Sequence, residues 1–83
     1  MIGEAIQLDS LAHLVAQRVI RDVVVGRVKG DNAQWTLSVR LGGPTARLVP
    51  VRSRREPLRI WTSLKAVVKF ADKVGIIRFS VEL

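Results

Sequence analysis

The spacing of the apolar residues constrains the fold of this chain most, because it changes from a helical period to a strand period and back. Between residues 8 and 21 the apolar positions recur every three or four residues, which is typical of one face of a helix. Asp9 or Ser10 can cap the first turn by accepting a hydrogen bond from a backbone N–H. The sequence therefore predicts a helix over residues 8–21.

The next stretch has the composition and alternation of β-strands. Residues 23–28 are rich in β-branched valines, and residues 35–41 place apolar side chains at every second position. Gly30, Asp31 and Asn32 lie between these segments and favour a tight turn. Residues 23–41 are therefore predicted to form a β-hairpin.

Three further segments are predicted to be extended. Residues 45–52 contain Pro50, which has no N–H for a strand ladder and therefore indicates an edge or a bulge. Residues 58–61 follow the next turn, and residues 77–83 alternate apolar and polar side chains as a closing strand.

A second helix is predicted before the closing strand. Thr62 or Ser63 can cap its start, and Gly75 is placed to end it in a left-handed turn. The predicted element order is α-β-β-β-β-α-β. We expect an α+β fold with an antiparallel sheet of about four to five strands and both helices on one face of the sheet.

The length of the chain favours a single domain over residues 1–83, because so few residues must share one core. The sequence has no cysteine, which excludes disulfides and thiolate metal sites. It also lacks an apolar stretch of the roughly 18 residues that a membrane span requires. We expect a soluble, cytoplasmic protein that uses neither a metal nor a cofactor.

The sequence carries no pattern that indicates an enzyme. General acid–base catalysis needs titratable groups placed together, whereas the chain has one histidine, His13, and its acidic residues are scattered singly. Asp9 is the one acid at helical spacing from His13, and a surface pair is the expected role of the two. A glycine-rich turn at residues 42–44 is too short for a phosphate-binding P-loop. We therefore predict a binding protein without catalytic residues.

The positive charge of the chain is unevenly distributed. The formal net charge is +7, yet residues 1–32 carry as many acids as cations, so the excess lies in residues 33–83. Arginine predominates there, and its guanidinium suits bidentate contact with phosphate or carboxylate. Such a cluster is typical of a nucleic-acid-binding surface, and DNA is the expected partner. The predicted contacts are Arg40, Arg47, Arg52, Arg54, Arg55, Arg59, Lys65 and Lys69.

Other interpretations of these residues stay open. The cations can form an ordinary solvated surface, or they can meet an acidic protein partner, because both kinds of polyanion attract arginine. A protein-interaction module is also consistent with the first predicted helix, whose apolar residues extend around more than one side. In a homodimer this helix would supply the interface residues Leu11, Val15 and Val19.

The aromatic residues are expected to serve the core. Trp35 and Trp61 can stack on bases, but large aromatic side chains contribute much of the core of a small domain. The sequence also lacks the aromatic motif by which RRM domains bind single-stranded RNA.

The C-terminal part of the chain has a recognisable order of features. Residues 52–82 read RSRREPLRIWTSLKAVVKFADKVGIIRFSVE. They contain basic residues, a short segment ending in an aromatic, Ser-Leu at a helix start, Gly-Ile and a closing Phe-x-Val strand. These features are Arg54, Arg55, Arg59, Trp61, Ser63-Leu64, Gly75-Ile76 and Phe79-Ser80-Val81.

This order resembles the C-terminal pattern of ParC-like partition-associated proteins, a family of small plasmid-encoded accessory proteins. The resemblance implies a DNA-maintenance role in a bacterium or mobile element, with a partner from a partition or plasmid-stability system. It carries over no catalytic residue. Lys65 departs from the pattern, because an acidic residue is more usual after Ser-Leu.

Overall fold

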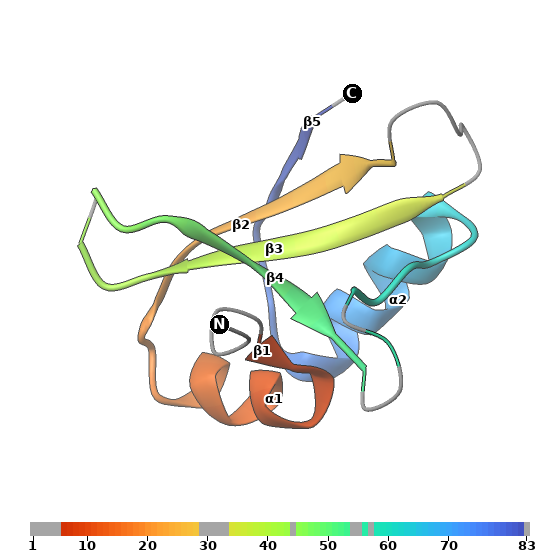
Figure 1. Ribbon diagram of the computed structural model, residues 1–83. Coiled ribbons are helices and arrows are strands. Elements are labelled where there is room, and N and C mark those ends of the chain that lie inside the picture. Colours follow the sequence, from red (N-terminus) through yellow and green to blue (C-terminus); the bar gives the residue numbers. More distant parts are fainter. Residues whose placement is uncertain (1–5, 29–33, 44, 54–55, 57, 83) are drawn as a thin grey trace.

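The strands of this chain form one mixed sheet, in the order β1-β4-β3-β2-β5 (Figure 1). The computed structural model describes residues 6–28, 34–43, 45–53, 56 and 58–82. The elements are β1 (Ile6–Gln7), α1 (Leu8–Ala16), β2 (Ile20–Arg27), β3 (Trp35–Leu41), β4 (Leu48–Arg52), α2 (Leu64–Val74) and β5 (Ser80–Glu82). The predicted α+β class is confirmed, and the two helices, the hairpin and the closing strand follow one another along the chain as predicted.

The predicted hairpin is confirmed as the antiparallel pair β2 and β3. Val23 lies opposite Val39 and Val25 lies opposite Leu37, so the alternation in both strands places buried side chains on the same face. The register shifts between Ile20 and Asp22, which is a β-bulge near the start of β2.

The sheet is mixed rather than purely antiparallel. β3 pairs antiparallel with β2 and β4, whereas β1 pairs parallel with β4 and β5 pairs parallel with β2. Parallel pairing needs a connection that crosses over the sheet, and each of these parallel pairs is joined through at least one helix.

The predicted fourth extended segment, residues 58–61, contributes one bridge instead of a full strand. Trp35 and Trp61 form two backbone hydrogen bonds, one from each N–H to the other carbonyl oxygen, at 2.8 and 2.9 Å. The Arg59 N–H also donates to the Val51 carbonyl oxygen at 2.9 Å. These bonds hold the segment against β3 and β4 just before α2 begins.

Helix α2 begins and ends as the sequence predicts. The Ser63 hydroxyl accepts a hydrogen bond from the Ala66 N–H at 3.1 Å, and Gly75 ends the helix with φ 92°. Helix α1, in contrast, ends at Ala16 and not near residue 21. The chain takes a left-handed conformation at Arg18, with φ 59°, and enters β2 from Ile20 onwards.

The core lies between one face of the sheet and the two helices. Leu11 of α1 and Val67 and Ala71 of α2 are buried in the same cluster as the inward-facing valines and leucine of β2 and β3. Both helices therefore pack on one face, as predicted; in Figure 1, α2 lies behind the sheet. The opposite face, here called the open face, carries the alternate residues of β2, β3 and β4, which are Asp22, Val24, Ser38, Arg40 and Pro50.

Candidate nucleic-acid interface

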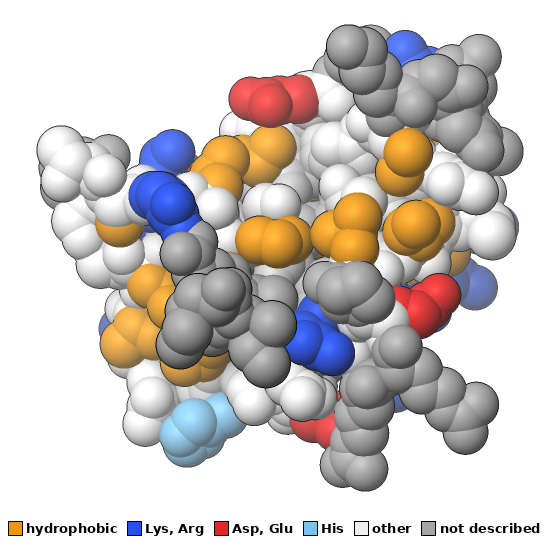
Figure 2. All heavy atoms as spheres, in the orientation of Figure 1, with side chains coloured by type: hydrophobic (Ala, Val, Ile, Leu, Met, Phe, Trp, Pro, Cys, Tyr) orange, Lys and Arg blue, Asp and Glu red, His pale blue; other side chains and the backbone are white. Residues whose placement is uncertain are grey.

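The predicted cations come from several elements of the fold. Figure 2 shows hydrophobic side chains across the middle of the viewed side of the molecule and most Lys and Arg side chains near its margins. The described members of this set belong to β3, to β4 and the segment before it, to the segment before α2 and to α2 itself.

Arg40 is engaged within the fold. Its Nη1 lies 2.6 Å from the Asp22 carboxylate, and its Nε donates to the Ala46 carbonyl oxygen at 2.7 Å. Asp22 of β2 lies directly opposite Arg40 of β3, so the register of the hairpin brings the two side chains together. The pair neutralises the guanidinium charge at this position, which leaves Arg40 a weak candidate for binding phosphate.

Arg47 and Arg52 lie at opposite ends of the β4 region. Arg47 is exposed just before β4, and Arg52 is the half-buried last residue of the strand. The Arg52 Nε donates to the Ser53 carbonyl oxygen at 3.1 Å. Arg54 and Arg55, which were also predicted as contacts, lie outside the described residues.

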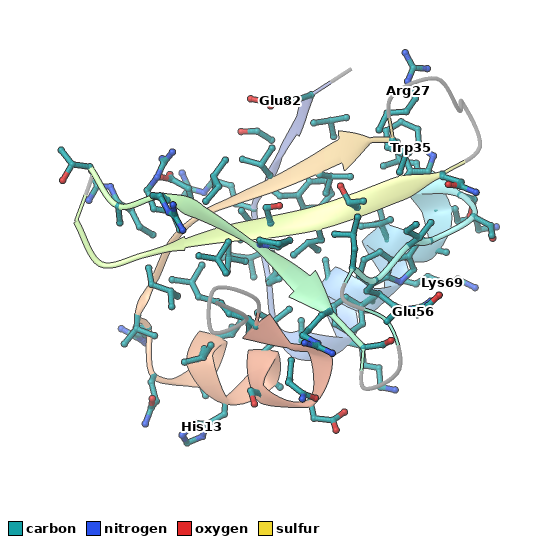
Figure 3. The ribbon with its side chains drawn as sticks, viewed as in Figure 1. His13, Arg27, Trp35, Glu56, Lys69 and Glu82 are labelled. Atoms are coloured by element: carbon teal, nitrogen blue, oxygen red, sulfur yellow. The ribbon has the colours of Figure 1, made fainter. Side chains whose placement is uncertain are left out.

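Two arginines are held over tryptophan rings at one end of the sheet. The guanidinium carbon of Arg59 lies 4.9 Å from the centre of the Trp61 ring, and that of Arg27 lies 6.0 Å from the centre of the Trp35 ring. Arg27 of β2 lies opposite Trp35 of β3, and Trp35 forms backbone hydrogen bonds with Trp61. Figure 3 shows Arg27 and Trp35 together at this end.

Helix α2 brings further cations to the same end. The Trp61 and Phe70 rings lie 5.2 Å apart, which fixes the helix beside the tryptophans. Lys65 in its first turn and Lys69 one turn later are both exposed, and the first turn contains no acidic residue. The positive end of the helix dipole adds to their field. We call the group Arg27, Trp35, Arg59, Trp61, Lys65 and Lys69 the tryptophan end.

The tryptophans of this end differ in burial. Trp61 is 5% exposed, so the prediction that it belongs to the core is confirmed. Trp35 is half-buried and packs at the margin of the core. The chemistry available at the tryptophan end is therefore anion binding by cations beside one partly accessible indole.

Arg27 is a candidate that the sequence did not single out. It lies in the part of the chain where acids and cations balance, so the charge distribution gave no reason to choose it. Its aromatic partner comes from the register of the hairpin. The sequence signal that could have found it is an arginine and a tryptophan on either side of the turn-favouring residues 30–32, at the ends of two predicted strands.

The predicted dimer residues of α1 are only partly available to a partner. Leu11 is completely buried in the core, so the prediction that it forms an oligomer interface is corrected. Val15 is half-buried and packs against the core, and Val19, which follows the helix, is 40% exposed. The apolar residues of α1 serve the monomer core first, because a chain of this size has few others to use.

Other kinds of site were sought among the residues that the structure describes. His13 is exposed on α1 and points outward in Figure 3. Within the described ranges, no three His, Asp or Glu side chains are grouped so that they could hold a metal ion. None of the described helices is long and apolar enough to cross a membrane.

The chain was also compared with known proteins. No protein-family model, curated protein or solved structure matches it.

Proposed function

We propose that this protein is a non-enzymatic nucleic-acid-binding protein that contacts phosphates through the tryptophan end, with DNA as the expected partner. The observation that carries the proposal is that Arg27 lies over the Trp35 ring and Arg59 over the Trp61 ring. The two tryptophans are themselves joined by backbone hydrogen bonds. Lys65 and Lys69 extend this basic surface along α2.

The ring contacts favour binding because they order the arginines in advance. A free arginine side chain loses about 2 kcal/mol of rotamer entropy when a contact fixes it. A guanidinium that already rests on an indole loses less of that freedom on meeting a phosphate. The Arg59 Nη1 donates a hydrogen bond to the Ile60 carbonyl oxygen at 2.9 Å, and a guanidinium has five N–H donors.

The setting in which such binding would act follows from the resemblance of residues 52–82 to ParC-like accessory proteins. That resemblance favours a role in plasmid partition or maintenance. Arg59, Trp61 and Ser63-Leu64 belong both to the resembling pattern and to the tryptophan end or the start of α2.

The test compares a variant of the tryptophan end with a matched control. Arg27→Gln with Arg59→Gln removes two charges and keeps side chains of similar length. We expect its affinity for random duplex DNA to fall about tenfold or more at fixed salt, and the slope of log affinity against log salt to decrease by about two. Fluorescence anisotropy of labelled DNA measures both quantities.

The control is Arg21→Gln with Lys73→Gln. It removes the same charge from exposed positions at the start of β2 and the end of α2. Arg21 lies about 20 Å along β2 from Arg27, by the rise of a strand. Arg21 and Arg78 also line a cleft of about 540 Å³, which is another place where an anion could bind. Equal loss of affinity in both double variants would contradict the proposal.

A protein-interaction role is the second candidate, and exposed apolar residues favour it. Val19, Val68, Ile77 and Val81 are all at least 40% exposed. Exposed apolar side chains of this kind can bind a protein, and the cations of the chain could then meet acidic residues of that partner. Absence of DNA binding at low salt would make this the better account.

A further inference from the structure

The free edge of β5 is the most accessible part of the sheet. All three residues of β5 are exposed, and among the described residues the strand pairs only with β2. An edge strand directs unpaired N–H and C=O groups away from its sheet and can add another strand there. Ile77, just before β5, is 94% exposed, and Val81 within it is 42% exposed.

The charges along this edge are complementary under antiparallel self-pairing. Arg78 and Glu82 are exposed and lie two residues to either side of Ser80. Arg78 and Phe79 precede β5. When two copies pair antiparallel about Ser80 and the pairing extends through these two residues, Arg78 of each copy lies opposite Glu82 of the other. Phe79 then lies opposite Val81, an aromatic and β-branched pair of the kind that stabilises sheets. Figure 3 shows Glu82 projecting from β5 clear of the other strands.

Symmetry restricts the register of such a pair. A twofold axis perpendicular to the sheet leaves each side chain on the same face of the sheet in both copies. Because side chains alternate between the two faces along a strand, the axis must pass beside one residue, which then lies opposite its own copy. Centring on Phe79 places Arg78 opposite Ser80, and centring on Val81 places Glu82 opposite Ser80. Among these three registers, centring on Ser80 alone gives two Arg–Glu pairs.

Other modes of self-association are less favourable. In-register parallel pairing of β5 and the two residues before it would place Arg78 beside Arg78 and Glu82 beside Glu82, which is repulsive. The two residues of the other edge strand, β1, are Ile6 and Gln7, and neither of them carries a charge. A twofold pair occupies the β5 edges of both copies, so the assembly closes as a dimer.

We propose that two copies of this chain associate through their β5 edges, antiparallel and centred on Ser80, to form one continuous sheet. The interface depends on Arg78 and Glu82 and on none of the residues of the tryptophan end. Its failure would therefore leave the nucleic-acid proposal standing, and the reverse also holds. The short edge predicts a weak dimer, with a dissociation constant on the order of micromolar.

The experiment uses charge reversal and sedimentation analysis of the full chain up to about 200 µM. Arg78→Glu places two glutamates opposite each other, and Glu82→Arg places two arginines opposite each other. Each change should weaken dimerisation about tenfold or more. The two changes shift the net charge in opposite directions, so a general effect of protein charge cannot weaken both.

Recombining the charges should restore the interface. An equimolar mixture of the Arg78→Glu and Glu82→Arg chains should form a heterodimer, because both opposed pairs become attractive again. The double variant should recover a homodimer for the same reason. Lys73→Glu changes the charge as much as Arg78→Glu, but at the end of α2, and should dimerise like the original chain. Circular dichroism checks the folding of each variant.

Three results would overturn the inference. These are a monomeric original chain at the highest concentration, single variants that dimerise as tightly as the original, and a mixture that associates no better than its components. If a single variant fails to fold, the double variant decides, because it keeps both exposed positions charged and restores the pairing.

Discussion

Left-handed backbone follows both helices, but glycine occupies only one of the two positions. Gly75 has φ 92° after α2, and Arg18 has φ 59° after α1. A residue with a Cβ carries a cost of about 1–2 kcal/mol in this conformation, and glycine avoids that cost. Arg18 is therefore a strained position, and replacing it should stabilise the fold.

We predict that Arg18→Gly raises the free energy of unfolding by about 0.5–1 kcal/mol, because relief of strain exceeds the entropy that glycine loses on folding. Chemical denaturation measures the change. The control is Gln17→Gly at the preceding residue, which has right-handed angles of φ −82° and ψ −3°. There glycine should lower stability. Equal loss of stability in both variants would show that Arg18 is not strained.

At the residue scale, the candidate site could be predicted only in part from the sequence. The density of cations after residue 33 identified Arg59, Lys65 and Lys69. The pattern did not reveal that Arg40 pairs with Asp22, because that pairing depends on the hairpin register. Arg27 was missed for the same reason, since its aromatic partner lies across the hairpin.

Among the elements, those with local signals were predicted best. Helix α2 has a serine cap and a glycine stop, and the sequence between β2 and β3 contains glycine, aspartate and asparagine, which favour a turn. The end of α1 was predicted too late, because apolar spacing continues into residues that join β2. The parallel pairs were also not predicted, since their partners are distant in sequence and tertiary packing selects them.

Helix α1 contributes Leu11 to the buried core. Leu11 is completely buried, whereas most neighbouring residues of the helix are exposed or half-buried. We predict that Leu11→Ala lowers the free energy of unfolding by about 2–5 kcal/mol, through lost apolar burial and the cavity left behind. Denaturant titration measures this loss. His13→Ala, on the exposed side of α1, should change stability by about 0.5 kcal/mol or less. A small effect at Leu11 would contradict its place in the core.

At the scale of the whole molecule, the two proposed interfaces use different residues. β5 runs parallel to β2, which ends at Arg27, so Glu82 lies toward the tryptophan end and Arg78 lies away from it. Antiparallel pairing of two β5 strands would place the tryptophan ends of the copies at opposite ends of the shared edge. A dimer would then present two basic surfaces, and one nucleic acid that reached both would be bound more tightly than by either alone.

The most direct measurement is a titration of random duplex DNA at several salt concentrations, followed by anisotropy and by tryptophan fluorescence. The chain has two tryptophans and no tyrosine, and both tryptophans lie at the tryptophan end, so their emission reports binding there. Contacts from Arg27, Arg59, Lys65 and Lys69 predict a slope of log affinity against log salt of about −3.5, together with a change in emission. No binding at low salt, or binding without a change in tryptophan emission, would contradict the account.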